Sequence, residues 1–285
     1  MLRAFGALER DETVRNPDHL AGSLAAASRT YRFGLRVASV PALHACCRWA
    51  FSRVTPGAYW AETARVKYVD EVLLGELAGG VRQVVVLGAG MDSRAYRFAP
   101  ELGGVRTIEV DHPVTSARKR ARVEAVFGAL PPDVTYLALD LTTDDLGQSL
   151  TAAGLDPSTP VLVLWIGVSM YLNEGVVAGV LGWAGGLSER SSIAFDYMER
   201  RFFEDERRFG APRRTRFLMA RSGEELSYGI ARPSLPGLLA RYGLSVKSHL
   251  GPTEMEARYL RRSNGRLAGH PFAYSGFVHA GVDRP

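Results

Sequence analysis

The apolar residues of the chain change their spacing near residue 80. From about residue 18 to 78 they recur every three or four positions, which is the spacing of one face of a helix. After Gly79 and Gly80, short β-branched runs alternate with helical stretches instead. The pattern therefore predicts an all-helical leader over residues 1–78, followed by an α/β domain over residues 79–285.

Seven short apolar runs in the second part predict buried strands. Their alternation with helical stretches predicts βαβ units and a parallel sheet. Runs that are apolar throughout, such as residues 161–166, fit strands that are covered on both faces. Helices are expected near residues 235–242 and over 253–262. The predicted strands cover residues 81–87, 105–110, 133–139, 160–166, 191–197, 244–249 and 272–279.

A polar, arginine-rich segment interrupts this alternation at about residues 198–223, where we expect no strand. We interpret the segment as an insertion or lid. Residues 199–217 hold seven arginines mixed with acidic residues and four phenylalanines. Two interpretations stay open: a solvated helix with ion pairs at three- and four-residue spacing, or a lid whose phenylalanines close over a substrate while arginines hold an anionic group.

The composition limits the cellular compartments and the kinds of partner that the sequence allows. No apolar run reaches the roughly 18 to 20 residues of a membrane span, and the N-terminus carries charges where a secretion signal would be apolar. We therefore expect a cytoplasmic enzyme without a membrane partner.

Cys46 and Cys47 are adjacent, a spacing that suits neither an ordinary disulfide nor a zinc site. We expect them to be buried thiols, and we expect no metal.

The net charge of +5 raises the question of a nucleic-acid partner. The arginines are dispersed along most of the chain, and no recognition helix or RNA-binding signature accompanies them. We therefore expect no nucleic-acid partner.

A glycine-rich turn follows the first predicted strand. Residues 84–87 run into Gly88, Ala89 and Gly90, and Asp92 is placed to cap the next helix. Glycine is needed in such a turn because the turn is tight and its backbone lies against a ligand without a Cβ in the way. The turn therefore predicts a cofactor site, although a tight turn in a domain that binds nothing has the same sequence.

Two acidic residues at the end of the second predicted strand strengthen this interpretation. Glu109 and Asp111 each follow a glycine of the turn by 21 residues, a spacing at which a carboxylate can accept both hydroxyls of a ribose. A dinucleotide fingerprint needs a third glycine at Ser93, which is absent. S-adenosylmethionine (SAM) has no pyrophosphate, so a SAM site loses little without that glycine.

These segments resemble the leucine carboxyl methyltransferase family, which includes enzymes that methylate the C-terminal carboxylate of protein phosphatase 2A and bacterial O-methyltransferases of polyketide biosynthesis. The resemblance implies a doubly wound, mostly parallel sheet of seven strands with the last one antiparallel. It also implies that the leader caps the active site at the carboxyl ends of the strands. The matching pieces are AYWAETARVKYVDEVL (58–73), VVVLGAGMDSRAYRF (84–98), TIEVDHP (107–113), LALDL (137–141), GVSMYL (167–172) and GLLARYGLSVKSHLGPTEMEARYL (237–260).

The resemblance also implies how the chain binds SAM. Arg65 should bind the carboxylate of the methionine moiety through its forked guanidinium, although an ordinary surface arginine would look the same in the sequence. Gly88 and Gly90 should contact the methionine part through their backbone. Asp111 should accept the ribose hydroxyls.

The adenine should lie farther along the same sheet edge. By the resemblance, Asp140 accepts its amino group and Leu141 packs beside it; the alternative for Asp140 is a loop cap. The chain departs from the family at Ile166, where relatives commonly have a glutamate close to the cofactor. This departure leaves open how the cofactor is held and whether transfer takes place.

Methyl transfer to oxygen is an in-line displacement, so positioning the acceptor does most of the work. A carboxylate acceptor is already ionised and needs no general base. A general base would help with a phenol or alcohol, and the candidates near the carboxyl edge of the sheet are Tyr171, Asp196 and Tyr197. His249 is a weaker candidate.

The sequence therefore favours a SAM-dependent O-methyltransferase that acts on a hydroxyl or carboxylate of a small molecule in secondary metabolism, with an acidic acceptor allowed. Two alternatives remain: a carboxyl methyltransferase of a peptide or protein C-terminus, and a SAM-binding protein without transfer activity. An open, arginine-lined pocket would favour the peptide enzyme. A closed apolar pocket would favour the small-molecule enzyme.

Overall fold

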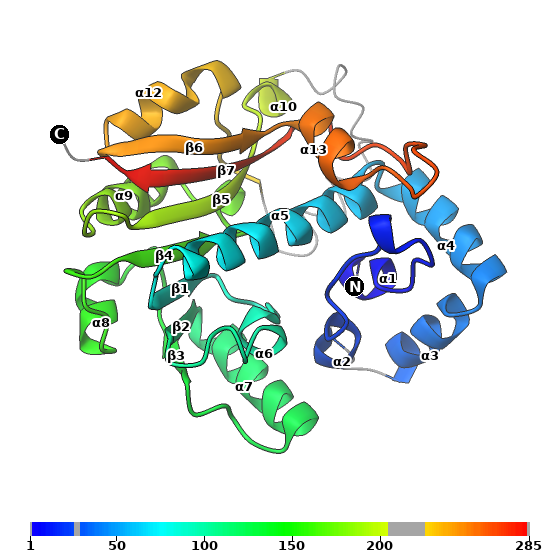
Figure 1. Ribbon diagram of the computed structural model, residues 1–285, viewed down its shortest axis with the longest axis horizontal. Helices are drawn as coiled ribbons and strands as arrows, with labels where there is room; N and C mark the ends of the chain where they lie inside the picture. Colours follow the sequence, from blue (N-terminus) through cyan, green and yellow to red (C-terminus); the bar gives the residue numbers. More distant parts are fainter. Residues whose placement is uncertain (1, 26–28, 205–225, 284–285) are drawn as a thin grey trace.

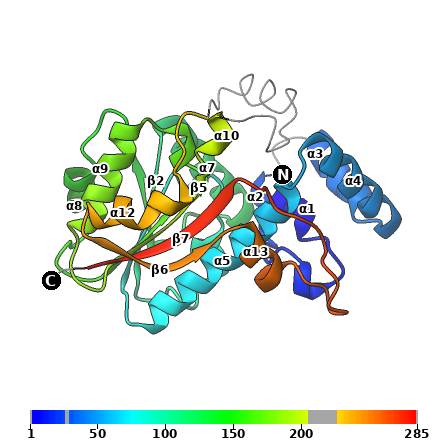
Figure 2. The ribbon, with the colours of Figure 1, turned by 90° about the horizontal axis from the view of Figure 1, so that it is seen from above.

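A computed structural model describes residues 2–25, 29–204 and 226–283, which build a seven-stranded sheet with helices on both faces (Figures 1 and 2). The strand order is β3-β2-β1-β4-β5-β7-β6. The strands are β1 Gln83–Leu87, β2 Arg106–Asp111, β3 Val134–Ala138, β4 Val161–Trp165, β5 Ser192–Met198, β6 Leu244–Leu250 and β7 Ser275–Val282. The helices are α1 Leu2–Gly6, α2 Ala21–Ala25, α3 Arg29–Ala38, α4 Pro41–Val54, α5 Ala58–Ala78, α6 Arg94–Arg97, α7 Pro113–Phe127, α8 Leu146–Ala152, α9 Glu174–Gly185, α10 Arg201–Glu204, α12 Leu235–Ala240 and α13 Pro252–Tyr259.

The sheet confirms the predicted α/β fold. All seven predicted strands form, and β1 to β5 pair in parallel. The last strand, β7, lies between β5 and β6 and runs antiparallel to both. β1 lies in the interior of the sheet with β2 and β4 as neighbours, which the glycine turn requires if it is to face a crevice.

The apolar runs become strands because helices cover both of their faces. Along β1, Val84 and Val86 face α5 and α13, whereas Val85 and Leu87 face α8, α9 and α12. Successive side chains of a strand point to opposite faces, so an unbroken apolar run supplies both layers of core. Figure 2 shows these two layers of helices on either side of the strands.

The described residues before β1 contain helices and turns and no strand. α5 is the longest of the described helices and crosses the sheet, while α3 and α4 lie at the end of the molecule away from it (Figures 1 and 2). No described helix combines the length and the apolar character needed to cross a membrane. The boundary between a leader and a domain at residue 79 stays a prediction.

Three expectations about local structure need correction or fall outside the described residues. Met198 is the last residue of β5 and pairs with Ser275, so the strand reaches into the segment where we expected none. The rest of the predicted lid lies largely in residues 205–225, outside the described part of the chain. Cys46 is exposed and Cys47 half-buried, because the face of α4 that carries Cys46 is turned to solvent.

Candidate active site

A cavity of about 580 Å³ opens at the carboxyl edge of the sheet. The strand order reverses between β1 and β4, because the chain continues from β1 to β2 on one side and from β4 to β5 on the other. Open α/β sheets bind ligands at such a point. The register pairs Leu87 with both Val110 and Trp165. It therefore brings the next residue of each strand or loop, Gly88, Asp111 and Ile166, to one edge of the sheet.

The glycine turn after β1 forms one wall of the cavity. Gly88 and Gly90 have φ angles of +64° and +45°, in the left-handed region that favours glycine. A Cβ on Gly88 would lie 2.2 Å from a methyl group of Val168. A Cβ on Gly90 would meet only the carbonyl oxygen of Gly88, at 3.9 Å. The first glycine therefore allows the β4 loop to approach, and the second leaves open space beside the backbone for a ligand.

Asp111 braces this turn from β2. Its Oδ2 accepts a hydrogen bond from the backbone N–H of Gly90 at 2.5 Å, and its Oδ1 accepts one from the N–H of His112 at 2.7 Å. Asp111 does not contribute to the cavity wall but lies next to the turn that does. Its predicted role with the ribose stays a prediction.

Glu109, the other acidic residue of the predicted pair, is buried behind the turn. Its carboxylate pairs with Lys119 Nζ at 2.8 Å and accepts a hydrogen bond from the Tyr96 hydroxyl at 3.3 Å. Burial raises the pKa of this carboxyl, against the opposing effect of Lys119. Lys119 in turn donates to the carbonyl of Ala89 at 3.4 Å. Glu109 therefore supports the glycine turn from behind, and Asp111 is the acid of the pair that bonds to the turn directly.

Asp92 lies in the cavity wall and is tied to the helix that follows. The helix cap is Ser93 rather than Asp92, but Asp92 Oδ1 accepts a hydrogen bond from the N–H of Arg94 at 2.8 Å. Its other oxygen pairs with the Arg94 guanidinium. Burial alone would raise the pKa of Asp92, but the nearby cations Arg94, Lys119 and Arg3 lower it below its usual range. Asp92 is therefore an ionised part of the wall.

Asp140 and Leu141 follow β3 and lie outside the cavity wall. Asp140 Oδ1 accepts hydrogen bonds from the hydroxyl and the N–H of Thr142, at 2.7 and 2.9 Å. These bonds lower the pKa of Asp140. They are the contacts of a loop cap, which was the alternative for this residue, and its contact with adenine stays a prediction.

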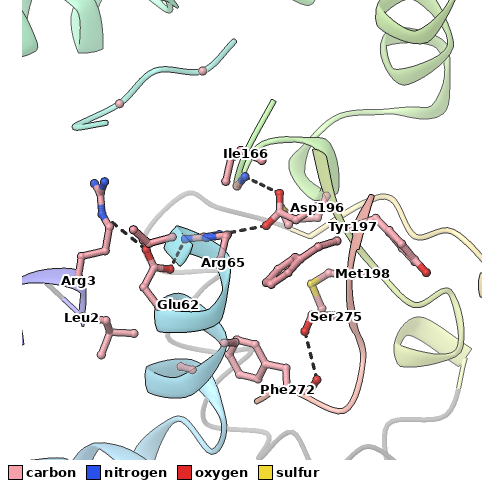
Figure 3. A pocket seen from close by; sticks show the side chains of 18 of the residues that line it. Leu2, Arg3, Glu62, Arg65, Ile166, Asp196, Tyr197, Met198, Phe272 and Ser275 are labelled. Carbon is pink, nitrogen blue, oxygen red and sulfur yellow. Dashed lines mark hydrogen bonds and ion pairs between the residues drawn. The ribbon is translucent and has the colours of Figure 1, made fainter. Parts of the chain in front are cut away.

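Arg65 projects from α5 into the cavity (Figure 3). Its Nη1 lies 3.1 Å from Asp196 Oδ2, and its Nη2 pairs with Glu62. Burial would lower the pKa of the guanidinium, but the two carboxylates outweigh that effect and raise it. Arg65 therefore faces the cavity as predicted for a carboxylate ligand, between two acidic side chains.

The three candidate bases differ in where their polar groups point. Asp196 and Tyr171 line the cavity, and Asp196 Oδ1 accepts the N–H of Gly167 at 2.6 Å. Tyr197 also touches the wall, but its hydroxyl bonds to His249 Nε2 at 2.9 Å. Figure 3 shows the Tyr197 side chain directed away from Arg65. The structure therefore brings Asp196 and Tyr171 together near Arg65 and directs the Tyr197 hydroxyl elsewhere.

Sequence patterns missed Arg3, which lies in the cavity wall next to Leu2. Arg3 Nη2 donates to the carbonyl of Met91 at 2.9 Å, and its Nη1 donates to Asp18 at 3.1 Å. Its Nε lies 3.6 Å from Glu62, the acid that also pairs with Arg65. No local pattern around Arg3 signals this contact, since Arg3 and Met91 lie 88 residues apart.

Sequence patterns also missed an apolar part of the wall. Residues 272–274 were predicted to begin the last strand, but β7 begins at Ser275. Phe272 and Tyr274 instead lie in a loop that lines the cavity, with their rings stacked at 4.9 Å. Met170 and Met198 pack against them. The apolar run was a valid signal of burial, but part of it faces a cavity instead of a helix.

The cavity wall offers no metal centre, because the described residues hold no group of three or more His, Cys, Asp or Glu side chains able to bind a metal ion. Ile166 lies in the wall where relatives commonly have a glutamate, and the N–H that follows it is bound to Asp196.

Comparison with known proteins identifies the family of the chain. Residues 3–185, more than half of the chain, match the model of the leucine carboxyl methyltransferase family. A Bacillus subtilis protein that carries the name of a SAM-dependent methyltransferase is 28% identical over 222 residues, which cover 76% of this chain and 71% of that protein. A Streptomyces coelicolor protein of the same name is 39% identical over 129 residues, 45% of this chain and 44% of its own length. The match thus spans less than half of that second relative.

Two solved structures share the fold. A methyltransferase from Thermobifida fusca superposes with a TM-score of 0.57 at 15% identity, covering 85% of this chain and 89% of that one. A DUF574 family protein from Streptomyces avermitilis gives a TM-score of 0.57 at 16% identity, covering 84% and 90%. At such identities the likeness concerns the fold alone, whereas the family match concerns the sequence itself. The chain belongs to the leucine carboxyl methyltransferase family and is a SAM-dependent methyltransferase.

Proposed function

We propose that the protein transfers the methyl group of SAM to an oxygen atom of a small-molecule acceptor. The observation that carries this proposal is a single cavity whose wall contains both the glycine turn and an apolar aromatic surface, with Arg65 facing into it. One ligand fits against the turn, and a second ligand fits against the aromatic surface. A transferase needs both in one enclosed space, since the acceptor oxygen must lie about 3 Å from the methyl carbon.

The residues of the turn suit the methionine part of SAM. The backbone of Gly90 faces open space, and Arg65 and Arg3 are the two arginines that lie beside Glu62 in the wall. A carboxylate ligand fits a forked guanidinium such as that of Arg65. Asp196 and Glu62, which flank Arg65, are the acids that would accept the ammonium group of the same moiety. With Ile166 in place of a glutamate, these two side chains supply the negative charge.

SAM supplies a methyl group that is activated by its positively charged sulfur. The chain has then only to hold the acceptor oxygen in line with that carbon and to exclude water. For a hydroxyl acceptor, Asp196 and Tyr171 are the groups in the wall that could take up or relay the proton. We place the reaction in secondary metabolism, because the chain resembles O-methyltransferases of polyketide biosynthesis.

Transfer of label from SAM tests this function. The pure protein is incubated with radiolabelled SAM and an extract of its native host, and the label is then divided between an organic extract and the precipitated protein. We expect the label in the organic extract. Label in the protein fraction would support the peptide or protein carboxyl methyltransferase instead, and SAM binding without any transfer would support the SAM-binding protein.

A variant with a blocked turn is the matched control. Gly88→Val places a branched side chain where even a Cβ would touch Val168. It should abolish labelling while circular dichroism shows the helices and strands retained. Labelling that persists in this variant would mean that the transfer comes from a contaminating enzyme.

A further inference from the structure

The apolar end of the cavity is built from side chains of four segments. We define the apolar compartment as Met170, Met198, Leu226, Phe272 and Tyr274, all of which line the cavity and pack into one cluster. Figure 3 shows Met198 and Phe272 on the side of the cavity away from Ile166. Within this compartment, the described side chains offer no charge.

The charged groups of the described cavity wall balance one another. Three are cations, and each has a carboxylate partner within 4 Å. Three are anions, and each of these pairs with one of the same arginines. The cations are Arg3, Arg65 and Arg94, and the anions are Glu62, Asp92 and Asp196. With Arg65 assigned to the carboxylate of SAM, only Arg3 and Arg94 of the described wall remain for an acidic acceptor, and Asp18 and Asp70 already hold them in ion pairs.

Among the described side chains of the apolar compartment, a carboxylate would find no cation to replace the water that it loses. Buried charges are stable only when they are paired and hydrogen-bonded. The described polar groups here are hydroxyls: Ser275 Oγ donates to the carbonyl of Phe272 at 3.2 Å, and burial raises the pKa of Tyr274, so that this phenol stays neutral. The compartment can accept a hydrogen bond from a neutral hydroxyl, but it does not compensate an anion.

The shape of the compartment favours a flat molecule. The rings of Phe272 and Tyr274 are stacked with an interplanar angle of 22°, and Phe202 packs behind Tyr274 at 4.3 Å. Stacked aromatic walls prefer another flat ring, in offset or edge-on contact. Met170 and Met198 add thioethers, which adapt their shape and make favourable contacts with aromatic rings.

Asp196 connects the compartment to the cofactor side. Asp196 and Met198 both line the cavity from β5. Alternate residues of a strand share a face and lie roughly 7 Å apart. A ring that packs against Met198 therefore presents its edge towards Asp196 and Arg65, on the side where the methyl group would arrive.

We propose, building on the function above, that the acceptor is a neutral, flat aromatic or polycyclic molecule with a hydroxyl group, selected by the apolar compartment. In the reaction the hydroxyl oxygen forms a bond to the methyl carbon, the carbon–sulfur bond of SAM breaks, and the hydroxyl proton passes to Asp196 or through Tyr171 and from there to solvent. The products are a methyl ether and S-adenosylhomocysteine. A carboxylic acid and a peptide C-terminus are excluded as preferred acceptors.

Two fluorescent probes with the same ring system test the charge preference. N-phenyl-1-naphthylamine is neutral, and 1-anilinonaphthalene-8-sulfonate adds one negative charge to it. Each is titrated into the full chain in the presence of S-adenosylhomocysteine. We expect the neutral probe to bind at least about tenfold more tightly, a difference of about 1.4 kcal/mol. Equal binding, or tighter binding of the sulfonate, would overturn the proposal and point to a cation outside the described residues.

Substitutions in the apolar compartment test whether the probes bind there. Phe272→Asp should weaken the neutral probe about tenfold or more, because it brings a charge into the stacked pair. Met198→Lys should reverse the preference towards the sulfonate by supplying an unpaired cation. Leu43→Lys on α4, where Leu43 is 44% exposed and outside the cavity wall, is the matched control and should change neither affinity. Circular dichroism and thermal unfolding show whether each variant is folded. If folded Phe272→Asp and Met198→Lys proteins bind both probes as the wild type does, the compartment is not the binding site.

The product supplies an independent readout. Methyl esters release methanol in alkali, whereas aryl methyl ethers do not. Labelled product from the host extract should therefore remain in the organic phase after alkaline treatment. Volatile labelled methanol would overturn the acceptor class while leaving methyl transfer to a small molecule intact. Failure of the wild-type chain to bind SAM in calorimetry would instead defeat the proposed function itself.

Discussion

Arg65 on α5 and Asp196 on β5 are separated by 131 residues, and their side chains meet at 3.1 Å in the cavity. The pair joins the helix before the sheet to a central strand at the point where the sheet edge opens. Because Arg65 is held there by two carboxylates, its guanidinium is oriented before any ligand arrives.

Replacing Arg65 should therefore weaken SAM binding. Arg65→Ala removes the forked donor and leaves Asp196 without its ion-pair partner, so we expect the Kd for SAM to rise tenfold or more, about 1.4 kcal/mol. Arg65→Lys should recover only part of the affinity, because an ammonium cannot reproduce the bidentate geometry. Calorimetry measures both. Arg258→Ala, which removes an exposed arginine paired with Glu71, should bind SAM as the wild type does. An Arg65→Ala protein with unchanged affinity would remove Arg65 from the site.

Asp111 should matter in two ways. Asp111→Ala removes the predicted acceptor of the ribose hydroxyls, at about 1.5 to 3 kcal/mol per charge-assisted bond, and it also releases the N–H of Gly90. We expect at least a tenfold rise in the Kd for SAM. Asp133→Ala, in an exposed loop before β3, is the control. If both variants bind SAM equally well by calorimetry, the ribose contact lies elsewhere.

Gly88 should tolerate no side chain unless Val168 makes room. A Cβ on Gly88 would lie 2.2 Å from Val168 Cγ2, at a φ of +64° that non-glycine residues rarely adopt. Gly88→Ala should therefore lower both the unfolding temperature and the SAM affinity. Adding Val168→Ala should relieve the steric part and restore some stability, but not the part due to φ. A double variant no more stable than Gly88→Ala would show that backbone strain alone accounts for the loss.

Glu9 should make stability fall in acid. Its carboxylate accepts a hydrogen bond from Tyr59 at 3.0 Å and pairs with Arg48 and His44. Burial raises its pKa, but these partners outweigh burial and lower it from 4.5 to about 2. The lowered value means that Glu9 stabilises the fold above pH 4.5 and that this contribution, about 3 kcal/mol, is lost as pH falls from 4.5 towards 2.

Urea unfolding of the wild type and of Glu9→Gln at pH 6 and pH 3 measures this contribution. The difference in the free energy of unfolding between the two proteins should be smaller at pH 3. A difference that is the same at both pH values would show that Glu9 does not titrate in this range.

The inner strands β1 and β4 were predictable because residues 84–87 and 161–165 are unbroken apolar runs with core on both faces, whereas the edge strands β3 and β6 are only partly buried. The glycine turn was predictable because its backbone demands small residues. The faces to which the side chains of the candidate bases point were only partly predictable. Asp196 and Tyr197 are neighbours on one strand, so their side chains must point to opposite faces, and the sequence does not say which of the two faces the cavity.

Contacts between distant segments carried no sequence signal. Arg3 reaches Met91 only because α1 packs against α5 in three dimensions, and no periodicity encodes that meeting. Likewise, residues 272–274 have the composition of a strand, and only the packing of the fold decides that they line a cavity instead. Cys46 was expected to be buried because cysteine side chains usually are, but its place on α4 leaves it exposed.

The position of Leu2 and Arg3 in the cavity wall has a practical consequence for handling the protein. Any peptide attached before them, whether an affinity tag or a fusion partner, leaves the molecule beside the cavity and can obstruct it. At the other end, β7 begins at the cavity with Ser275 and runs away from it to Val282, roughly 23 Å along an eight-residue strand. Figure 1 shows the two ends on opposite sides. Purification handles and surface anchors therefore belong at the C-terminus.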